Sequence, residues 1–256
     1  MKISVALVLL FALAPAGRGQ SAGGVRGLPR GAFVVETRPL DLGGGRRRAL
    51  LLWMLGPSRH PFAGGDDESY TCPDQTRGSH YHGPTRVSLL DTAAGRVINT
   101  VRVMPDDEGA EDVFDIPYRL RPGNHYHVEG GDERKEGRAV VTRLRDYNGD
   151  GESLEFALYD AVACMPLMTA LYGYSRRQDR VVQYDFHLEV SDGGKISRQV
   201  WRWVDYLFAR EPARPGRWNY EIDYRGRGGS LDGFEIRYNP SLERFEGKVA
   251  RTAGGQ

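Results

Sequence analysis

Apolar positions along the chain alternate with polar ones or form short unbroken runs, and both patterns are typical of β-strands. The first strong strand is predicted at residues 49–55, where the wholly apolar run indicates a strand buried on both faces. Residues 85–103 predict a β-hairpin, because Val87 and Leu89 alternate with polar neighbours and apolar positions resume after the turn at 93–95. The chain is therefore expected to be all-β.

One turn frame occurs three times. In each copy an apolar or aromatic residue ends a strand, a short polar residue opens the turn, and an Arg five positions later starts the return strand. The copies are Leu90-Asp91 with Arg96-Val97, Tyr174-Ser175 with Arg180-Val181, and Tyr238-Asn239 with Arg244-Phe245. Three matches predict repeated strand and hairpin units, arranged as an incomplete β-propeller or as a β-sandwich.

A Gly-rich loop also recurs. The loop at 146–151 has a counterpart at 223–228, and both continue with Ser, Leu and an acid before a Phe. The repeat units have unequal spacing, with an insertion at 160–170 in the middle unit. Residues 200–208 fit both alternation and helical spacing; their Trp, Tyr, Phe and Val content favours a strand, and a helix is the alternative.

The loop at 146–151 carries the side chains that calcium prefers. Calcium takes about six to eight oxygen ligands, and Asp146, Asn148 and Asp150 alternate so that all three can point inward. Gly151 allows a sharp turn, after which the carbonyl of Glu152 can face the ion. The spacing therefore predicts a calcium site.

The match to an EF-hand loop covers only its first half. Position twelve, a bidentate Glu in EF-hands, is Ala157, and no helical pattern flanks the loop. The sequence instead resembles the calcium loops of FG-GAP and VCBS repeats, in which D-x-N-x-D-G segments lie between strands of exported propeller proteins. The resemblance implies a structural calcium ion. Those families place the next acid at position nine, which is Leu154 here, so the neighbouring Glu155 is taken as the final ligand.

The counterpart loop lacks this chemistry, since Arg225 and Arg227 take the positions of Asn148 and Asp150. One calcium site is therefore expected in the chain, and zinc is not the expected ion. For residues 146–151 the alternative is a tight turn held by Asx-type hydrogen bonds without metal.

Four histidines form two pairs, His80 with His82 and His125 with His127, each flanking a Tyr. On strands, the two imidazoles of a pair share a face, and two pairs meeting across a sheet could bind zinc or copper. No Cys or carboxylate lies at a supporting spacing, and such alternation also suits an ordinary exposed strand. The pairs define an alternative metal site and an alternative function, an exported metal-dependent hydrolase.

Residues 1–16 have the order of a secretory signal peptide, with a basic residue, an apolar run and a small-residue site. No later run approaches the roughly 18 to 20 apolar residues that a membrane helix requires. The remaining chain is expected to comprise a partly ordered Gly- and Arg-rich lead-in at 17–48 and a single β-repeat domain at 49–250. It is expected to be secreted or periplasmic.

Such a compartment allows Cys72 and Cys164 to form a disulfide, with two separate buried thiols as the alternative. Without residues 1–16, which contain Lys2, 34 basic residues (35 − 1) face 34 acidic ones, a balance that argues against nucleic-acid binding.

Neither a G-x-S-x-G elbow nor an H-E-x-x-H helix occurs, so no catalytic residue is assigned. The expected function is a non-catalytic binding or structural role toward a protein or carbohydrate ligand. A carbohydrate-binding module that stacks sugars on aromatic rings is a further alternative. Its candidate rings are Trp201, Trp203, Trp218 and Tyr220.

Overall fold

The computed structural model describes residues 20–21, 25–62, 78–105, 112–132, 135–161 and 166–253. Within these residues, regular structure is β-strand apart from two short 3-10 turns, η1 (Leu207–Ala209) and η2 (Arg225–Arg227). The expected all-β class is confirmed. No helix in the described ranges has the length and apolar character needed to cross a membrane. The predicted signal segment at 1–16 and both Cys72 and Cys164 lie outside the described residues.

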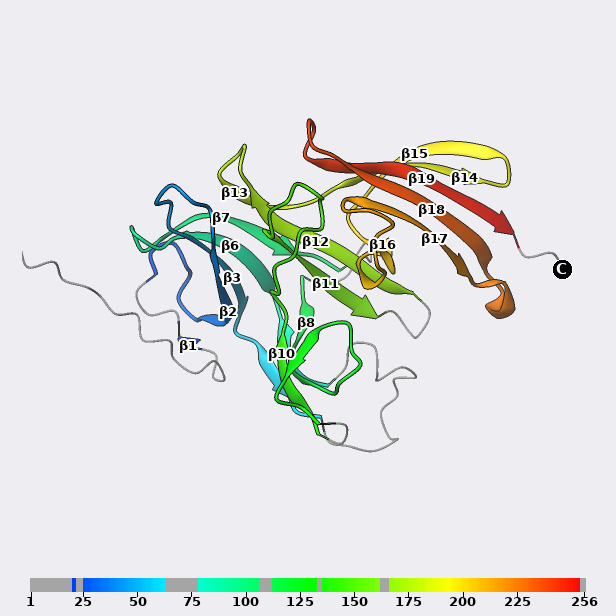
Figure 1. The fold of residues 1–256 in the computed structure, drawn as a ribbon. Helices are drawn as coiled ribbons and strands as arrows, with labels where there is room; N and C mark the ends of the chain where they lie inside the picture. Colours follow the sequence, from blue (N-terminus) through cyan, green and yellow to red (C-terminus); the bar gives the residue numbers. More distant parts are fainter. Residues whose placement is uncertain are drawn as a thin grey trace, which may run out of the picture.

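The described strands form four sheets (Figure 1). The first contains, in spatial order, β1 (Gln20–Ser21), β2 (Ala32–Leu40), β3 (Arg48–Leu55), β6 (Thr85–Asp91) and β7 (Arg96–Val103). The second contains β4 (Ser58–His60), β5 (Ser79–Gly83), β8 (Phe114–Leu120), β10 (Gly137–Val140) and β9 (His127–Glu129). The third contains β11 (Glu155–Ala161), β12 (Leu167–Ser175) and β13 (Arg180–Gln183), with β16 (Val204–Asp205) beside β12. The fourth contains β15 (Lys195–Trp201), β14 (Phe186–Asp192), β19 (Arg244–Ala253), β18 (Ser230–Asn239) and β17 (Arg217–Asp223).

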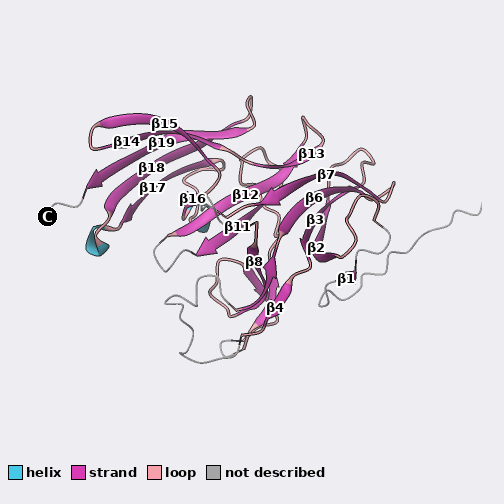
Figure 2. Ribbon diagram, turned by 180° about the vertical axis from the view of Figure 1, so that it is seen from behind, coloured by secondary structure: helices cyan, strands magenta, loops and turns pink. Residues whose placement is uncertain are grey.

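The first, third and fourth sheets follow one another along one side of the molecule, and the second lies below the first and third (Figures 1 and 2). Buried side chains from all four sheets belong to one main hydrophobic cluster. The four sheets therefore share a core.

Strand β3 is buried on both faces, as its apolar run predicts. Alternate residues pack into different clusters, Leu50, Leu52 and Met54 into the main one and Ala49, Leu51 and Trp53 into a second. Strand β2 pairs with β3 from Ala32 to Leu40. The expected lead-in at 17–48 thus supplies a complete strand to the first sheet.

A side chain joins the first sheet to the third. The amide of Asn99 in β7 donates from Nδ2 to the carbonyl oxygen of Val181 (2.8 Å) and accepts at Oδ1 from the Val181 N–H (3.0 Å). It therefore satisfies both backbone groups of a β13 residue, as a neighbouring strand would.

All three copies of the turn frame form hairpins with the same register. Leu90 pairs with Val97, and the corresponding pairs are Tyr174 with Val181 and Tyr238 with Phe245. Each hairpin lies in a different sheet, and the surrounding strands differ. In the middle unit, β11 follows the Gly-rich loop and β12 then enters the turn, whereas in the last unit β18 follows the loop and enters the turn itself.

The segment at 200–208 is neither one strand nor one helix. Strand β15 ends at Trp201, β16 follows, and η1 then begins at Leu207. Tyr206, directly before η1, has a left-handed backbone (φ 55°), which ends the extended run.

Candidate functional site

The loop at 146–151 lies directly before β11 and is closed by an isolated bridge between Arg145 and Glu155. Gly149 and Gly151 have φ values of 77° and 89°, a region that favours glycine. A Cβ on Gly149 would also approach the backbone of Pro215 to 2.6 Å. The glycines of the predicted motif are therefore required by the turn and by its packing.

Asp146, the first predicted ligand, organises the loop through backbone hydrogen bonds. Its Oδ1 accepts from the N–H groups of Gly149 (2.7 Å) and Asp150 (3.1 Å), and its Oδ2 accepts from that of Gly151 (2.9 Å). This is the Asx-type turn that the metal-free alternative describes.

Asn148 and Asp150 form hydrogen bonds with each other. Asn148 Oδ1 accepts from the Asp150 N–H (2.9 Å), and its Nδ2 donates to Asp150 Oδ2 (2.9 Å) and to Glu155 Oε1 (3.1 Å). Asp150 Oδ1 accepts from the Glu152 N–H (2.9 Å). The amide nitrogen of Asn148 thus bridges two carboxylates.

The side chain of Glu152 forms an ion pair with Arg176. Its carbonyl oxygen, the group expected to face calcium, accepts from the Leu154 N–H (3.2 Å).

Glu155 folds back under the loop and is completely buried. Its Oε2 accepts from the Tyr147 N–H (3.2 Å). Burial, with the nearby charges of Asp150 and Asp146, raises the pKa of Glu155 to about 9. Among the described residues, no cationic side chain forms an ion pair with this carboxyl, so a folded protein without a bound cation keeps it protonated at neutral pH.

As arranged, no three His, Cys, Asp or Glu side chains in the described ranges converge to hold a metal ion. Asp146, Asn148, Asp150 and Glu155 nevertheless come from one short segment, as the motif predicts. Calcium at this loop remains a prediction. Binding would require the side-chain oxygens to exchange hydrogen bonds within the loop for bonds to the ion.

In the counterpart loop at 223–228 and the strand that follows it, arginine side chains pair with the acidic residues. Arg225 donates to both oxygens of Asp223, from Nε (2.9 Å) and Nη2 (2.7 Å), and this pairing lowers the pKa of Asp223 to about 2. Asp232, at the position of Glu155, pairs with Arg251 (3.3 Å). Here guanidinium groups offset the acids, whereas no such group reaches Glu155 among the described residues.

The structure does not bring the two histidine pairs together. His80 and His82 lie in β5 and His127 in β9, and β8 and β10 separate these strands. His125 stacks on Tyr159 (ring centroids 5.5 Å apart), and burial lowers its pKa. A single site formed by both pairs has no geometric basis.

His80 and His82 have neighbours that sequence reasoning missed. His60 in β4 pairs in register with His80, and Asp115 in β8 pairs with His82. The alternating Ser58-Arg59-His60 indicates a short strand with His60 on one face. The sequence does not indicate that this strand pairs with β5, because a long segment separates the two.

The aromatic residues considered for sugar stacking are largely used inside the protein. Trp203 and Trp218 are buried, and the Tyr220 ring stacks on Phe234 (4.7 Å). Trp201 is half-buried and donates to the side chain of Gln199 (2.7 Å). These rings form no exposed platform.

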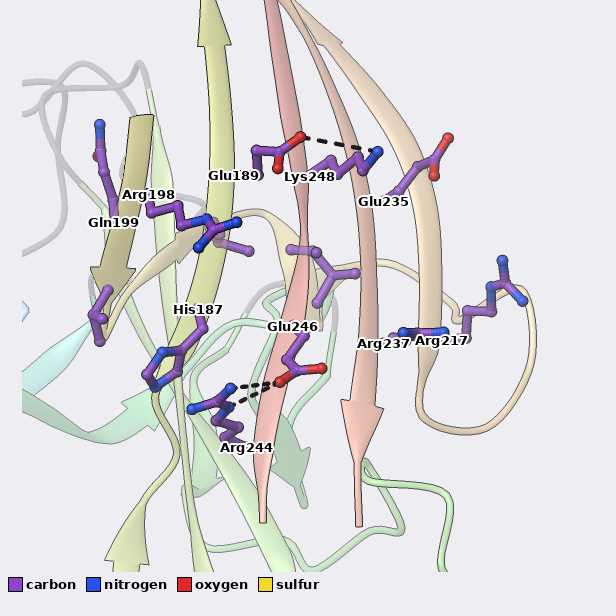
Figure 3. Close-up of a pocket in the computed structure, with 14 residues that line it drawn as sticks. His187, Glu189, Arg198, Gln199, Arg217, Glu235, Arg237, Arg244, Glu246 and Lys248 are labelled. Carbon is purple, nitrogen blue, oxygen red and sulfur yellow. Dashed lines mark hydrogen bonds and ion pairs between the residues drawn. The ribbon is translucent and has the colours of Figure 1, made fainter. Parts of the chain in front are cut away.

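The fourth sheet has a buried face and an open one. Inward residues such as Phe186 and Phe245 join the core, while the outward face forms a groove of about 750 Å³ (Figure 3). Opposite charges alternate across the strands of this face, in the order Arg198, Glu189, Lys248 and Glu235. Such a balanced row is typical of a solvated sheet face.

No family model, curated protein or solved structure matches the chain.

Proposed function

We propose that this chain is an exported, non-catalytic β-sheet protein with a binding or structural role, in which the loop at 146–155 holds one structural calcium ion. The observation that carries the proposal is the convergence of two carboxylates. Asp150 Oδ2 and Glu155 Oε1 lie 2.9 and 3.1 Å from the same atom, the amide nitrogen of Asn148.

A cation near that position would interact with both carboxylates at once. Calcium–oxygen distances are about 2.3–2.6 Å, so small inward movements of Asp150 and Glu155 would suffice. Rotation of the Asn148 amide by half a turn would present its oxygen in place of its nitrogen. The ion would also compensate the buried charge of Glu155, as Arg251 does for Asp232 in the counterpart loop.

The open face of the fourth sheet supports the binding role. Its groove is lined by charged side chains on regular strands, which suits reversible contact with a partner's surface (Figure 3). Five basic and three acidic side chains line this groove, so it has a small excess of positive charge.

Thermal unfolding in calcium and in chelator tests the calcium site. Calcium at ten times its Kd should stabilise the folded protein by about 1.4 kcal/mol. This corresponds to a rise of about 3–6 °C in Tm for a chain of this size. Asp150→Ala should abolish this difference, because it removes one of the two converging carboxylates.

Arg225→Ala is the matched control, since it alters the counterpart loop and should leave the calcium response intact. The difference between the two conditions is the readout, because Asp150→Ala also removes hydrogen bonds and lowers Tm in chelator. Equal Tm values for the unmodified protein in calcium and in chelator would reject the site.

A further inference from the structure

Three histidines and one aspartate share one face of the second sheet. Residues paired directly across antiparallel strands place their side chains on the same side, and here His60 pairs with His80 and His82 pairs with Asp115. His80 and His82 are two positions apart in β5, so all four side chains lie on one face.

On the opposite face of these strands, aromatic side chains pack against one another. Tyr81, between the two histidines, contacts the rings of Phe33 (4.8 Å) and Tyr118 (4.6 Å), and Arg59 lies over Tyr118 (4.7 Å). Among the described residues, the ring contacts of the histidine face are those between the histidines themselves. His60 is exposed and the His82 side chain is 48% exposed, so ligands from solvent can reach them.

The spacing of the rings matches that of metal ligands. The His60 ring centroid lies 5.2 Å from that of His80 and 6.0 Å from that of His82. Two imidazoles bound to one zinc ion, at Zn–N distances of about 2.0–2.1 Å, have centroids roughly 5 Å apart. The rings therefore have about the separation that shared coordination requires, but His60 and His80 stack nearly parallel (10°), so ring rotation must accompany metal binding.

Hydrogen bonds also set which ring nitrogens are free. His80 Nδ1 lies 3.0 Å from the carbonyl oxygen of Gly78, which can only accept, so a neutral His80 carries its proton there. Its Nε2 lone pair then faces Asp115 Oδ2 at 3.7 Å. His82 Nδ1 donates to Asp115 Oδ1 (2.8 Å), which leaves the Nε2 of a neutral His82 unprotonated.

A lone pair that faces a carboxylate is unfavourable unless a proton or a metal ion lies between them. Backbone carbonyls and carboxylates that hold one imidazole nitrogen are also the usual supports of histidine ligands. Among the described residues, the His60 ring has one hydrogen bond, between its Nε2 and the hydroxyl of Ser58 (2.8 Å), and an exposed side chain can exchange this bond easily.

We propose that His60, His80, His82 and Asp115 bind one divalent transition-metal ion of the imidazole-preferring class, with zinc as the reference ion. The donors do not converge as they stand, so binding includes rotation of the exposed His60 and His82 rings. Calcium does not occupy this site, because it prefers oxygen ligands. The site is separate from the loop at 146–155 and does not depend on the calcium proposal.

Calorimetric titration of the full, chelator-treated chain with zinc, in excess calcium, tests this proposal. One zinc ion should bind the unmodified protein. His82→Ala should weaken the zinc affinity by about 100-fold. Asp115→Asn should weaken it by at least about 10–100-fold, the range found when a support of a metal ligand is removed, because it removes both a charged ligand and the carboxylate that holds His82. Copper and nickel titrations should show the same pattern.

His127→Ala is the matched control, because it changes the same position of the other histidine pair and should leave zinc affinity unchanged. His60→Ala, at an exposed position, provides a second ligand variant that does not threaten folding. Absence of zinc binding to the unmodified protein overturns the proposal. It is also overturned if His60→Ala and His82→Ala bind zinc as tightly as the unmodified chain, or if His127→Ala weakens binding as much as His82→Ala.

Discussion

Replacing Phe245 with alanine should lower the free energy of unfolding by about 3–5 kcal/mol, the range for removal of a large buried ring. Phe245 is fully buried at the start of β19, under the fourth sheet. Five aromatic rings have centroids within 5.1 to 6.0 Å of it, namely Tyr184, Phe186, Phe208, Trp218 and Tyr238. Each such pair adds about 0.5–1.5 kcal/mol to the effect of area burial, so the cost should lie near the upper end of the range.

Denaturant unfolding of the purified protein measures this effect. Leu242→Ala is the control, because this side chain lies in the same hairpin turn but is 47% exposed. It should change the free energy of unfolding by no more than about 0.5 kcal/mol. A cost below about 1 kcal/mol for Phe245→Ala would contradict the aromatic packing under the fourth sheet.

The sequence predicts this hairpin but not the role of Phe245 in the core. Local features determine the hairpin: the turn frame places Tyr238 opposite Phe245, and the structure has this register. The aromatic cluster depends on distant segments, including the parallel pairing of Phe186 with Phe245. A strand pattern indicates which face is apolar, but it does not indicate which distant strand covers that face.

The same limit explains the two candidate metal sites. Asp146, Asn148 and Asp150 come from one loop, so their spacing alone predicts that they lie close together, and Glu155 follows shortly after, at the start of β11. The cluster around His80 and His82 is assembled across three strands. His60 and Asp115 reach it only through strand register, which depends on long-range pairing. The matching His-Tyr-His spacing suggested His125 and His127 as partners of His80 and His82, and the structure places them apart.

The stability of the calcium-free protein should fall as pH rises, because of Glu155. Its pKa in the folded protein is about 9, against an ordinary value of 4.5, so the folded state binds this proton more tightly than the unfolded state. The protonated carboxyl therefore stabilises the fold fully below pH 4.5, and this contribution is lost as pH rises toward 9. The slope is at most about 1.4 kcal/mol per pH unit between those values. Denaturant unfolding in chelator from pH 5 to pH 8.5 measures it.

Calcium should cancel this dependence, because a bound ion replaces the proton on Glu155 and leaves the carboxyl deprotonated in both the folded and the unfolded state above pH 4.5. Binding at pH 7 should release about one proton, and calcium affinity should rise by up to about tenfold per pH unit below pH 9. Calorimetry in buffers with different ionisation enthalpies measures the released proton. Glu155→Gln should remove both the pH slope in chelator and the calcium response, since a neutral amide neither titrates nor offers a charged ligand.

Glu152→Gln is the control for this experiment, because the expected contribution of Glu152 to calcium binding is its backbone carbonyl, and its side chain instead pairs with Arg176. The substitution removes a half-exposed ion pair, worth about 0–1 kcal/mol, and should retain both the pH slope and the proton release. Two outcomes would distinguish a calcium site that uses Glu155 from the alternatives. A pH slope without any calcium response means that Glu155 is buried in a metal-free turn, whereas calcium binding without proton release means that the ion is held without Glu155.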